Sequence, residues 1–213
     1  MDKTFLAVLP LALAATISPS GLLFVMMILS GKDKPKTKSL QFVLGAAAFL
    51  FILGLITFLT FKPAINATAH PSATSAIIDI IFGVLILGVI VHSVFGKKKD
   101  KTDNKKHNIP YILIGFLYMI INVSTLLPYV AALKIISTNK LGVFDDFWMF
   151  IVVLLITMLM VSFPVVITYA LPNSSKKILD PTTRFFSKYG KTIANVYFFA
   201  IAIYLIAKGV IHF

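Results

Sequence analysis

A polar, helix-breaking stretch stands in the middle of an apolar segment near the N-terminus. Ile17-Ser18-Pro19-Ser20-Gly21 divides residues 5–29, which carry no charge and are long enough to span a bilayer. Proline removes a backbone donor and clashes with the preceding helical turn. In secondary transporters, discontinuous helices of this kind bind the substrate near the membrane midplane. A tolerated kink is the other interpretation that this stretch leaves open, because proline and glycine are common in membrane helices.

A second polar stretch lies about a hundred residues later, where residues 121–127 align with residues 17–23. The polar positions of the two stretches coincide: Asn122 with Ser18, Ser124 with Ser20, and Thr125 with Gly21. The breaking proline is displaced, to Pro128. Interrupted segments at matching positions in two halves of a chain point to a transport site. We therefore predict one substrate site formed by Ser18, Pro19, Ser20, Gly21, Asn122, Ser124, Thr125 and Pro128.

Catalysis is the competing use of these serines. An intramembrane enzyme needs a nucleophile beside a base, or paired acids, at membrane depth. The histidines are expected in loops or near span ends, at His70, His92, His107 and His212. The sequence has no Gly-x-Ser-x-Gly or His-Glu-x-x-His motif, and the lack of cysteine excludes thiolate metal sites and thiol redox chemistry. We expect a protein without catalytic residues or cofactors.

Asp79 is the only acid expected inside a span, and one carboxylate does not make a divalent-cation site, so no metal site is predicted. Two interpretations of Asp79 stay open. It either lies in water near the outer headgroups, with Lys62 in reach, or binds and releases a proton during transport, because an ionised carboxylate in hydrocarbon is costly. His92 is roughly 20 Å further along the same helix and cannot pair with it.

The composition predicts an integral membrane protein. Of 213 residues, 58% are hydrophobic and 13% charged, and the mean hydropathy is +0.93. The 20 Lys and Arg outnumber the 8 Asp and Glu, but they cluster in short gaps between apolar runs. This leaves no room for a soluble basic domain, so we expect membrane lipids rather than nucleic acid as partners.

The apolar runs predict six spans, at about residues 5–29, 39–61, 73–95, 109–133, 147–171 and 192–211. We expect the first to remain as a span rather than to be cleaved as a signal peptide, because few charges precede it and its apolar run is long. Lys62-Pro63 should end the second span, and the small residues 45–48 should let it pack closely on other helices. Residues 134–146 and 173–191 are expected as loops, the latter with a short helix on the membrane surface.

The distribution of basic residues predicts the orientation. The gaps after the first, third and fifth spans hold 4, 6 and 5 of the 20 Lys and Arg. The positive-inside rule then places these gaps in the cytoplasm and both termini outside. Lysines at such positions contact anionic headgroups, which explains their number without a soluble partner.

Three spans in each half require the halves to run in opposite directions across the membrane. We expect a first repeat at 1–96, a basic cytoplasmic linker at 97–108 and a second repeat at 109–213. In this alignment Asp79 falls opposite Asn195, and His92 opposite Lys208. The predicted fold is an all-α integral membrane protein of six transmembrane helices, arranged as two inverted three-helix repeats with broken first and fourth helices.

These motifs resemble a known family. The Ser18-Pro19-Ser20-Gly21 break is similar to the Ser-Pro-Gly-Pro stretch of the lysine exporter superfamily, and residues 115–122 resemble the Gly-Phe…Asn opening of that family's fourth helix. The chain departs from the pattern at Ser20-Gly21 and at Val123, which replaces a proline, and these departures disfavour the amino-acid-exporting branches. The resemblance is greatest to the glycolipid-addressing, Sap-like branch, and it implies a six-helix exporter of lipidic cargo.

Together these features predict a secondary transporter of the cell (cytoplasmic) membrane. We expect it to export a lipid, glycolipid or small amphipathic metabolite by alternating access. Export of an amino acid stays open, because a half-helix N-terminus can hold a carboxylate. A non-transporting membrane scaffold subunit also stays open, as does a homodimer.

Overall fold

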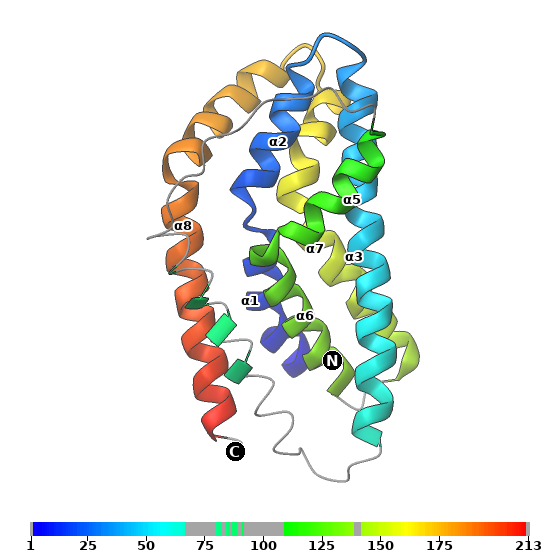
Figure 1. Cartoon of the computed structure of the whole chain (residues 1–213), viewed down its shortest axis with the longest axis vertical. Helices are drawn as coiled ribbons and strands as arrows, with labels where there is room; N and C mark the ends of the chain where they lie inside the picture. The colour runs from blue at the N-terminus through cyan, green and yellow to red at the C-terminus, as the bar shows by residue number, and fades with distance from the viewer. Residues whose placement is uncertain are drawn as a thin grey trace.

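A computed structural model describes residues 2–66, 80–81, 84–85, 87–88, 91, 109–138 and 142–211. The regular structure in that part is entirely helical and forms seven helices: α1 (Asp2–Thr16), α2 (Pro19–Leu29), α3 (Pro35–Asn66), α5 (Tyr111–Ile121), α6 (Val123–Thr138), α7 (Val143–Ala170) and α8 (Ser175–Ile211). They form an elongated bundle with α8 along one side (Figure 1). Most of the third predicted span, with Asp79 and His92, lies outside the described residues, as does the linker 97–108.

The two predicted helix breaks are confirmed. α1 and α2 meet at an angle of 46°, and α5 and α6 at 75°, and each pair is apolar enough to count as one broken span. Pro35–Thr57, Phe144–Ala170 and Lys177–Ala207 are each long and apolar enough to cross a membrane unbroken. The protein is therefore a multi-pass membrane protein with three to five candidate spans among the described residues.

The two breaks form by different means. Pro19 starts α2 at a position where its missing N–H costs nothing, and Ser18 precedes it outside helical geometry. At the second break, Asn122 ends α5, and its carbonyl accepts the N–H groups of Thr125 at 3.0 Å and Leu126 at 3.2 Å, which starts α6. Pro128 lies inside α6, so the expectation that it breaks the fourth span is wrong.

Glycines allow α3 and α5 to cross at close range. A Cβ on Gly45 would overlap the backbone carbonyl of Ile112, and one on Gly115 would overlap that of Phe42. Both glycines are buried at the crossing. This confirms that the small residues of the second span serve close helix packing.

Three expected boundaries are wrong. α3 continues through Lys62-Pro63 to Asn66. α6 extends to Thr138 and α7 begins at Val143, so the ends of the expected loop 134–146 are helical. Lys134 and Asp146 are consequently buried, at 2% and 0% exposure, and Asp79 is not the only acid within a span. Asp146 lies in the first turn of α7, where a negative side chain suits the helix dipole.

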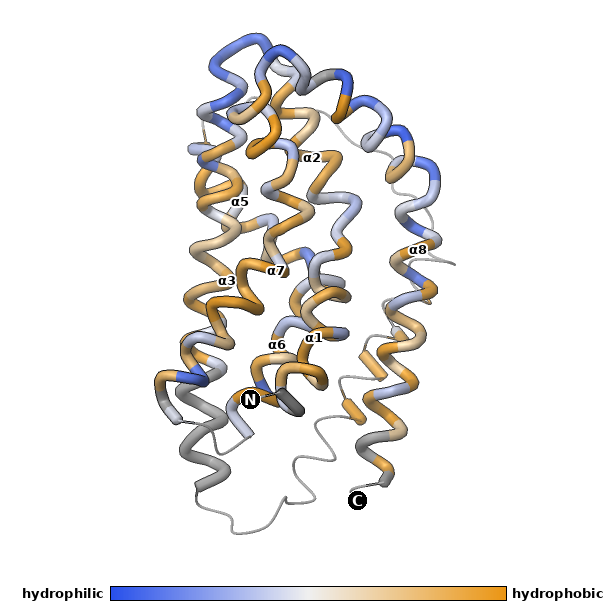
Figure 2. The backbone as a smooth tube through the Cα atoms, turned by 180° about the vertical axis from the view of Figure 1, so that it is seen from behind, coloured by the Kyte–Doolittle hydropathy of each residue, from blue (hydrophilic) through white to orange (hydrophobic). Residues whose placement is uncertain are grey.

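The expected surface helix and sixth span are a single helix, because α8 runs without interruption over 37 residues. Gly190, where a break would be cheapest, is buried against Pro19: an added Cβ would lie 2.8 Å from the Pro19 Cβ. α8 therefore stays helical at the point where it approaches the first break closely. Hydrophilic residues of the α2–α3 loop and of the first half of α8 gather at one end of the bundle (Figure 2). The start of α1 and the end of α8 lie at the other end (Figure 1).

The contacts of the two halves correspond. α1 packs on α7 as α5 packs on α3, α2 packs on α7 as α6 packs on α3, and α2 packs on α3 as α6 packs on α7. Among the contacts between the two halves whose equivalents are also described, one has no counterpart. α1 packs closely on α6, whereas no Cα atom of α2 comes within 8 Å of one of α5, although both helices are fully described.

Candidate binding site

Asn122 joins the two helix breaks. Its side-chain Nδ2 donates one hydrogen bond to Ser18 Oγ at 3.0 Å and another to Thr125 Oγ1 at 2.9 Å. Its Oδ1 accepts a hydrogen bond from Ser124 Oγ at 2.8 Å. The amide thus uses both donor hydrogens, and the side chain is only 7% exposed. The structure therefore brings together polar residues that lie about a hundred positions apart in the sequence.

Tyr118 also takes part in this junction, although it is not among the site residues predicted from the sequence. Its hydroxyl lies 2.9 Å from Ser20 Oγ and 3.2 Å from Ser18 Oγ. Tyr118 precedes Asn122 by one helical turn, so both side chains project from the same face of α5. That spacing was the available sequence signal.

Because Gly21 has no side chain, the Tyr118 side chain can reach the first break. An added Cβ would lie 2.9 Å from Ser18 Oγ and 3.1 Å from the Tyr118 hydroxyl. The Ser18 N–H, which a continuous helix would use internally, instead points at Met160 Sδ at 3.2 Å. Backbone and side-chain groups around the first break are therefore held by contacts from α5 and α7.

The hydroxyls at the junction can both donate and accept. Ser18 Oγ accepts from Asn122, and in its contact with Tyr118, as in that of Ser20 with Tyr118, either hydroxyl can be the donor. Ser124 donates to Asn122 and keeps an oxygen lone pair free to accept. α2 and α6 both begin here, so the positive ends of two helix dipoles also meet at the junction.

A cavity of about 350 Å³ adjoins the junction. Pro19 and Ser20 line it from the first break, and Ser124 from the second. α8 contributes Lys191 and Asn195, and the remaining wall is mostly apolar. The volume lies within the range of small-molecule pockets. Its chemistry is that of a binding site for a molecule with one polar, acceptor-bearing part and one apolar part.

The other predicted site residues lie around the cavity rather than on it. Thr125 is 1% exposed and orients Asn122, while Gly21 is buried beneath Tyr118. Pro128 is buried within α6, away from the cavity lining. Asp79 falls outside the described residues, so its role as a proton-coupling acid stays a prediction.

Aromatic rings fill the space between α2 and α5. The Phe24 ring stacks on Phe42 at 5.0 Å and on Tyr118 at 5.9 Å between centroids, and Phe42 and Tyr118 lie 5.4 Å apart. We call these three side chains the aromatic cluster. They connect helices whose backbones do not touch, on the side of the junction that faces the α2–α3 loop.

Comparison with known families gives a match over nearly the whole chain. A family described as Sap, sulfolipid-1-addressing protein, matches residues 8–211. No curated protein and no solved structure matches the chain. The family match covers both breaks and every helix of the described part from residue 8 onward, and it confirms the resemblance to the glycolipid-addressing branch.

Proposed function

We propose that this chain, which belongs to the Sap, sulfolipid-1-addressing protein family, is a secondary transporter that exports a lipid or another amphipathic molecule across the cell membrane. The family name ties its members to a sulfolipid, and the chain is a multi-pass membrane protein. The observation that carries the proposal is the hydrogen-bonded junction of two broken helices beside a cavity of about 350 Å³. Irregular backbone at membrane depth is tolerated where it is buried in protein or lines a cavity.

The arrangement of helices supports alternating access by two inverted repeats. The correspondence of α1–α7 with α5–α3, and of α2–α7 with α6–α3, is what a pseudo-twofold axis in the membrane plane produces. The repeats would be residues 1–96 and 109–213. The unmatched α1–α6 contact supports a state that is closed on that side, while side chains that include the aromatic cluster fill the opposite side.

The clustering of basic residues supports an orientation. The α2–α3 loop and the start of α8, which are rich in lysine, lie at one end of the bundle (Figure 2). The positive-inside rule makes this end cytoplasmic and places both termini outside. With an impermeant maleimide on intact cells, Lys177→Cys should stay unlabelled and Phe144→Cys should react. The reverse labelling would overturn the orientation.

We call the cavity of about 350 Å³ beside the junction the central cavity. Its apolar wall favours a lipid over an amino acid as cargo, because Leu23, Phe186 and Phe198 offer no hydrogen-bond or ion-pair partner to the charged groups of an amino acid. Amino-acid export is the second candidate, since two half-helix N-termini suit a carboxylate.

Transport can be measured with purified protein in phosphatidylcholine liposomes that contain a fluorescent, sulfate-bearing lipid. Dithionite bleaches only the probe in the outer leaflet, so the bleached fraction reports translocation. We expect Asn122→Leu to reduce the protein-dependent rate at least about tenfold, because an unpaired buried hydroxyl costs about 1–3 kcal/mol. Ser162→Leu is a matched control, since among the described residues Ser162 bonds only within its own helix, to Met158 O and Leu159 O.

Three outcomes separate the candidates. Equal loss in Asn122→Leu and Ser162→Leu would contradict a site at the junction. Wild-type protein that translocates no faster than empty liposomes would contradict lipid transport. Radiolabelled amino-acid uptake in the same liposomes then distinguishes an amino-acid exporter from a scaffold.

A further inference from the structure

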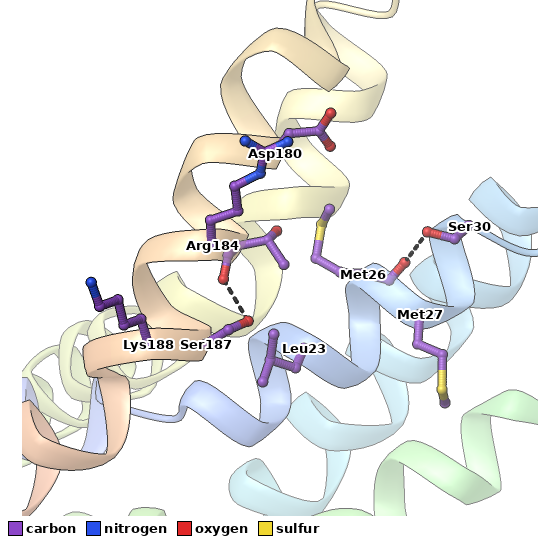
Figure 3. A pocket seen from close by; sticks show the side chains of 9 residues that line it. Leu23, Met26, Met27, Ser30, Asp180, Arg184, Ser187 and Lys188 are labelled. Atoms are coloured by element: carbon purple, nitrogen blue, oxygen red, sulfur yellow. Dashed lines mark hydrogen bonds between the residues drawn. The ribbon is translucent and has the colours of Figure 1, made fainter.

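A second, larger cavity lies away from the junction, between α2 and the first half of α8. Its volume is about 790 Å³. Figure 3 shows Leu23, Met26 and Met27 of α2 on one side of it, and the α8 residues Arg184 and Lys188 on the other. The cavity thus combines an apolar wall with a basic one.

The basic side chains are the groups available to a ligand. The hydroxyls of Ser30 and Ser187 donate to carbonyls of their own helices, Met26 O at 2.9 Å and Thr183 O at 2.7 Å (Figure 3). Arg184 forms no ion pair or hydrogen bond within the part of the chain that the structure describes. Lys188 lies 4.9 Å above the Tyr189 ring, which leaves its charge unneutralised. A guanidinium and an ammonium one helical turn apart recognise a sulfate or phosphate group.

The acid nearby does not cancel this charge. Asp180 lines the same cavity but forms no ion pair with Arg184 in the described part. The cavity wall keeps a net positive charge, because Arg184 and Lys188 outnumber the single carboxylate of Asp180. Lys177 and Lys191, also in the first half of α8, do not line the cavity.

An apolar cavity of about 570 Å³ adjoins the first break. Leu159 and Phe163 of α7 and Phe185 and Ile193 of α8 line it, and almost none of its wall is polar. Such a space accommodates hydrocarbon and excludes a hydrated anion.

The central cavity shares wall residues with each of these two spaces. Leu23 and Ser187 line both the basic cavity and the central cavity. Ile17 and Phe186 line both the central cavity and the apolar one. All three cavities lie along α8, so one molecule could place a polar group and a hydrocarbon chain in them together.

We propose that Arg184 and Lys188 form a docking site for the sulfate or phosphate headgroup of an anionic lipid, whose acyl chain lies in the cavity beside Phe163 and Phe185. This rests on the proposed function, and it adds to the junction a separate site where the lipid binds first. The continuous α8 is what carries the headgroup site and the apolar wall on one element.

Photo-crosslinking tests the docking site. A phosphatidic acid with a diazirine in its acyl chain is titrated into full-length protein held in phosphatidylcholine nanodiscs. The double variant Arg184→Gln, Lys188→Gln should need roughly 25-fold more probe for half-maximal crosslinking, about fivefold for each cation near an anionic group. The matched control, Lys32→Gln with Lys177→Gln, removes two exposed charges that line none of these three cavities. It should shift the curve less than about twofold. Crosslinked peptides should contain residues 159–163 or 185–193.

Each outcome decides the inference. Equal shifts in the two double variants would mean general attraction of anionic lipid to a basic surface, and would overturn it. Protection by sodium sulfate at matched ionic strength, without crosslinks beside Phe163, would mean a free-anion site and overturn the lipid assignment. The translocation assay is independent. Wild-type binding without translocation contradicts the transport proposal alone, and translocation unaffected by Arg184→Gln, Lys188→Gln contradicts the docking site alone.

Discussion

The α1–α6 and α2–α5 pairs would be equivalent in two symmetric repeats, yet they pack differently. α1 and α6 contact each other closely and contribute alanines at 0–1% exposure: Ala12, Ala14, Ala15, Ala131 and Ala132. α2 and α5 have no Cα atoms within 8 Å of each other and meet only through side chains such as Phe24 and Tyr118. Backbone-to-backbone packing of small residues is hard to separate, whereas rings can change rotamer. Under the proposed transport mechanism, we expect the α2–α5 side of the junction to be the one that opens.

The largest effect on stability should come from Gly45, where α3 and α5 cross at close range. Gly45→Ala places a methyl group into the Ile112 carbonyl, and neither backbone can retreat without moving its helix. Overpacking of this kind costs about 1–3 kcal/mol or more, so the thermal midpoint should fall by roughly 10 °C. Gly142→Ala is the control, because nothing lies within 4 Å of its added Cβ. A midpoint equal to wild type would mean that α5 is not held by α3, and that the α2–α5 gap has no fixed wall.

Removing one ring of the aromatic cluster should open the α2–α5 side. Phe24→Ala deletes two ring contacts, each contributing about 0.5–1.5 kcal/mol, so the open population should rise about tenfold. The reporter is the labelling rate of Ser18→Cys by a water-soluble maleimide, because Ser18 is 1% exposed and the cysteine-free chain permits a single label. Phe51→Ala, whose ring packs on Phe150 at 5.5 Å, serves as the control and should leave the rate unchanged. Equal acceleration in both variants would contradict a closure specific to the cluster.

Tyr118→Phe separates the ring from the hydroxyl. The ring contacts with Phe24 and Phe42 persist, so Ser18→Cys labelling should not accelerate. The hydroxyl contacts with Ser18 and Ser20 are lost, so lipid translocation should fall about fivefold, in line with about 0.5–1.5 kcal/mol for a hydrogen bond. Tyr204→Phe, on an exposed position of α8, is the control. Faster labelling with unchanged translocation would make Tyr118 part of the closure and not of the site.

The smallest effect concerns the exposed turn at the α2–α5 end. Lys38 Nζ lies 2.6 Å from Asp33 Oδ2, and this hydrogen bond and charge lower the pKa of the Asp33 carboxyl. A lowered pKa stabilises the fold above the ordinary value of 3.8, and the effect is lost as the pH falls through the folded-state value. Asp33→Asn should therefore change the thermal midpoint barely at pH 7 and not at all at pH 2, because exposed ion pairs contribute little. A large change at pH 7 would make this turn part of the closure.

The sequence predicted the junction but not how it is built. Polar side chains that interrupt an apolar run need hydrogen-bond partners, and few other polar groups lie at the same depth. Ser18 and Asn122 could therefore be paired from their positions in the sequence. Tyr118 lies in an otherwise apolar run, and its spacing of one helical turn from Asn122 was the only sequence signal. The structure shows its hydroxyl at the break.

Helix ends were harder to predict than breaks. Hydropathy averages over a window, so the charges of Lys134 and Asp146 suggested a loop although the backbone stays helical and buries both. The same averaging divided α8 into a surface helix and a span. The contact of Gly190 with Pro19 is a long-range feature, and no local pattern encodes it.

The most direct test of the central claim is a pair of spin-label distance measurements in liposomes. One pair, Met27→Cys with Ile112→Cys, spans α2 and α5, and the other, Leu6→Cys with Thr138→Cys, spans α1 and α6. Met27, Ile112 and Leu6 are exposed at 60%, 47% and 67%, so labels fit at these three positions without disturbing the core. On addition of the sulfate-bearing lipid, we predict a shift in the α2–α5 distance distribution and a compensating shift, of opposite sign, between α1 and α6. Two distributions that stay unchanged with saturating lipid would contradict alternating access around the junction.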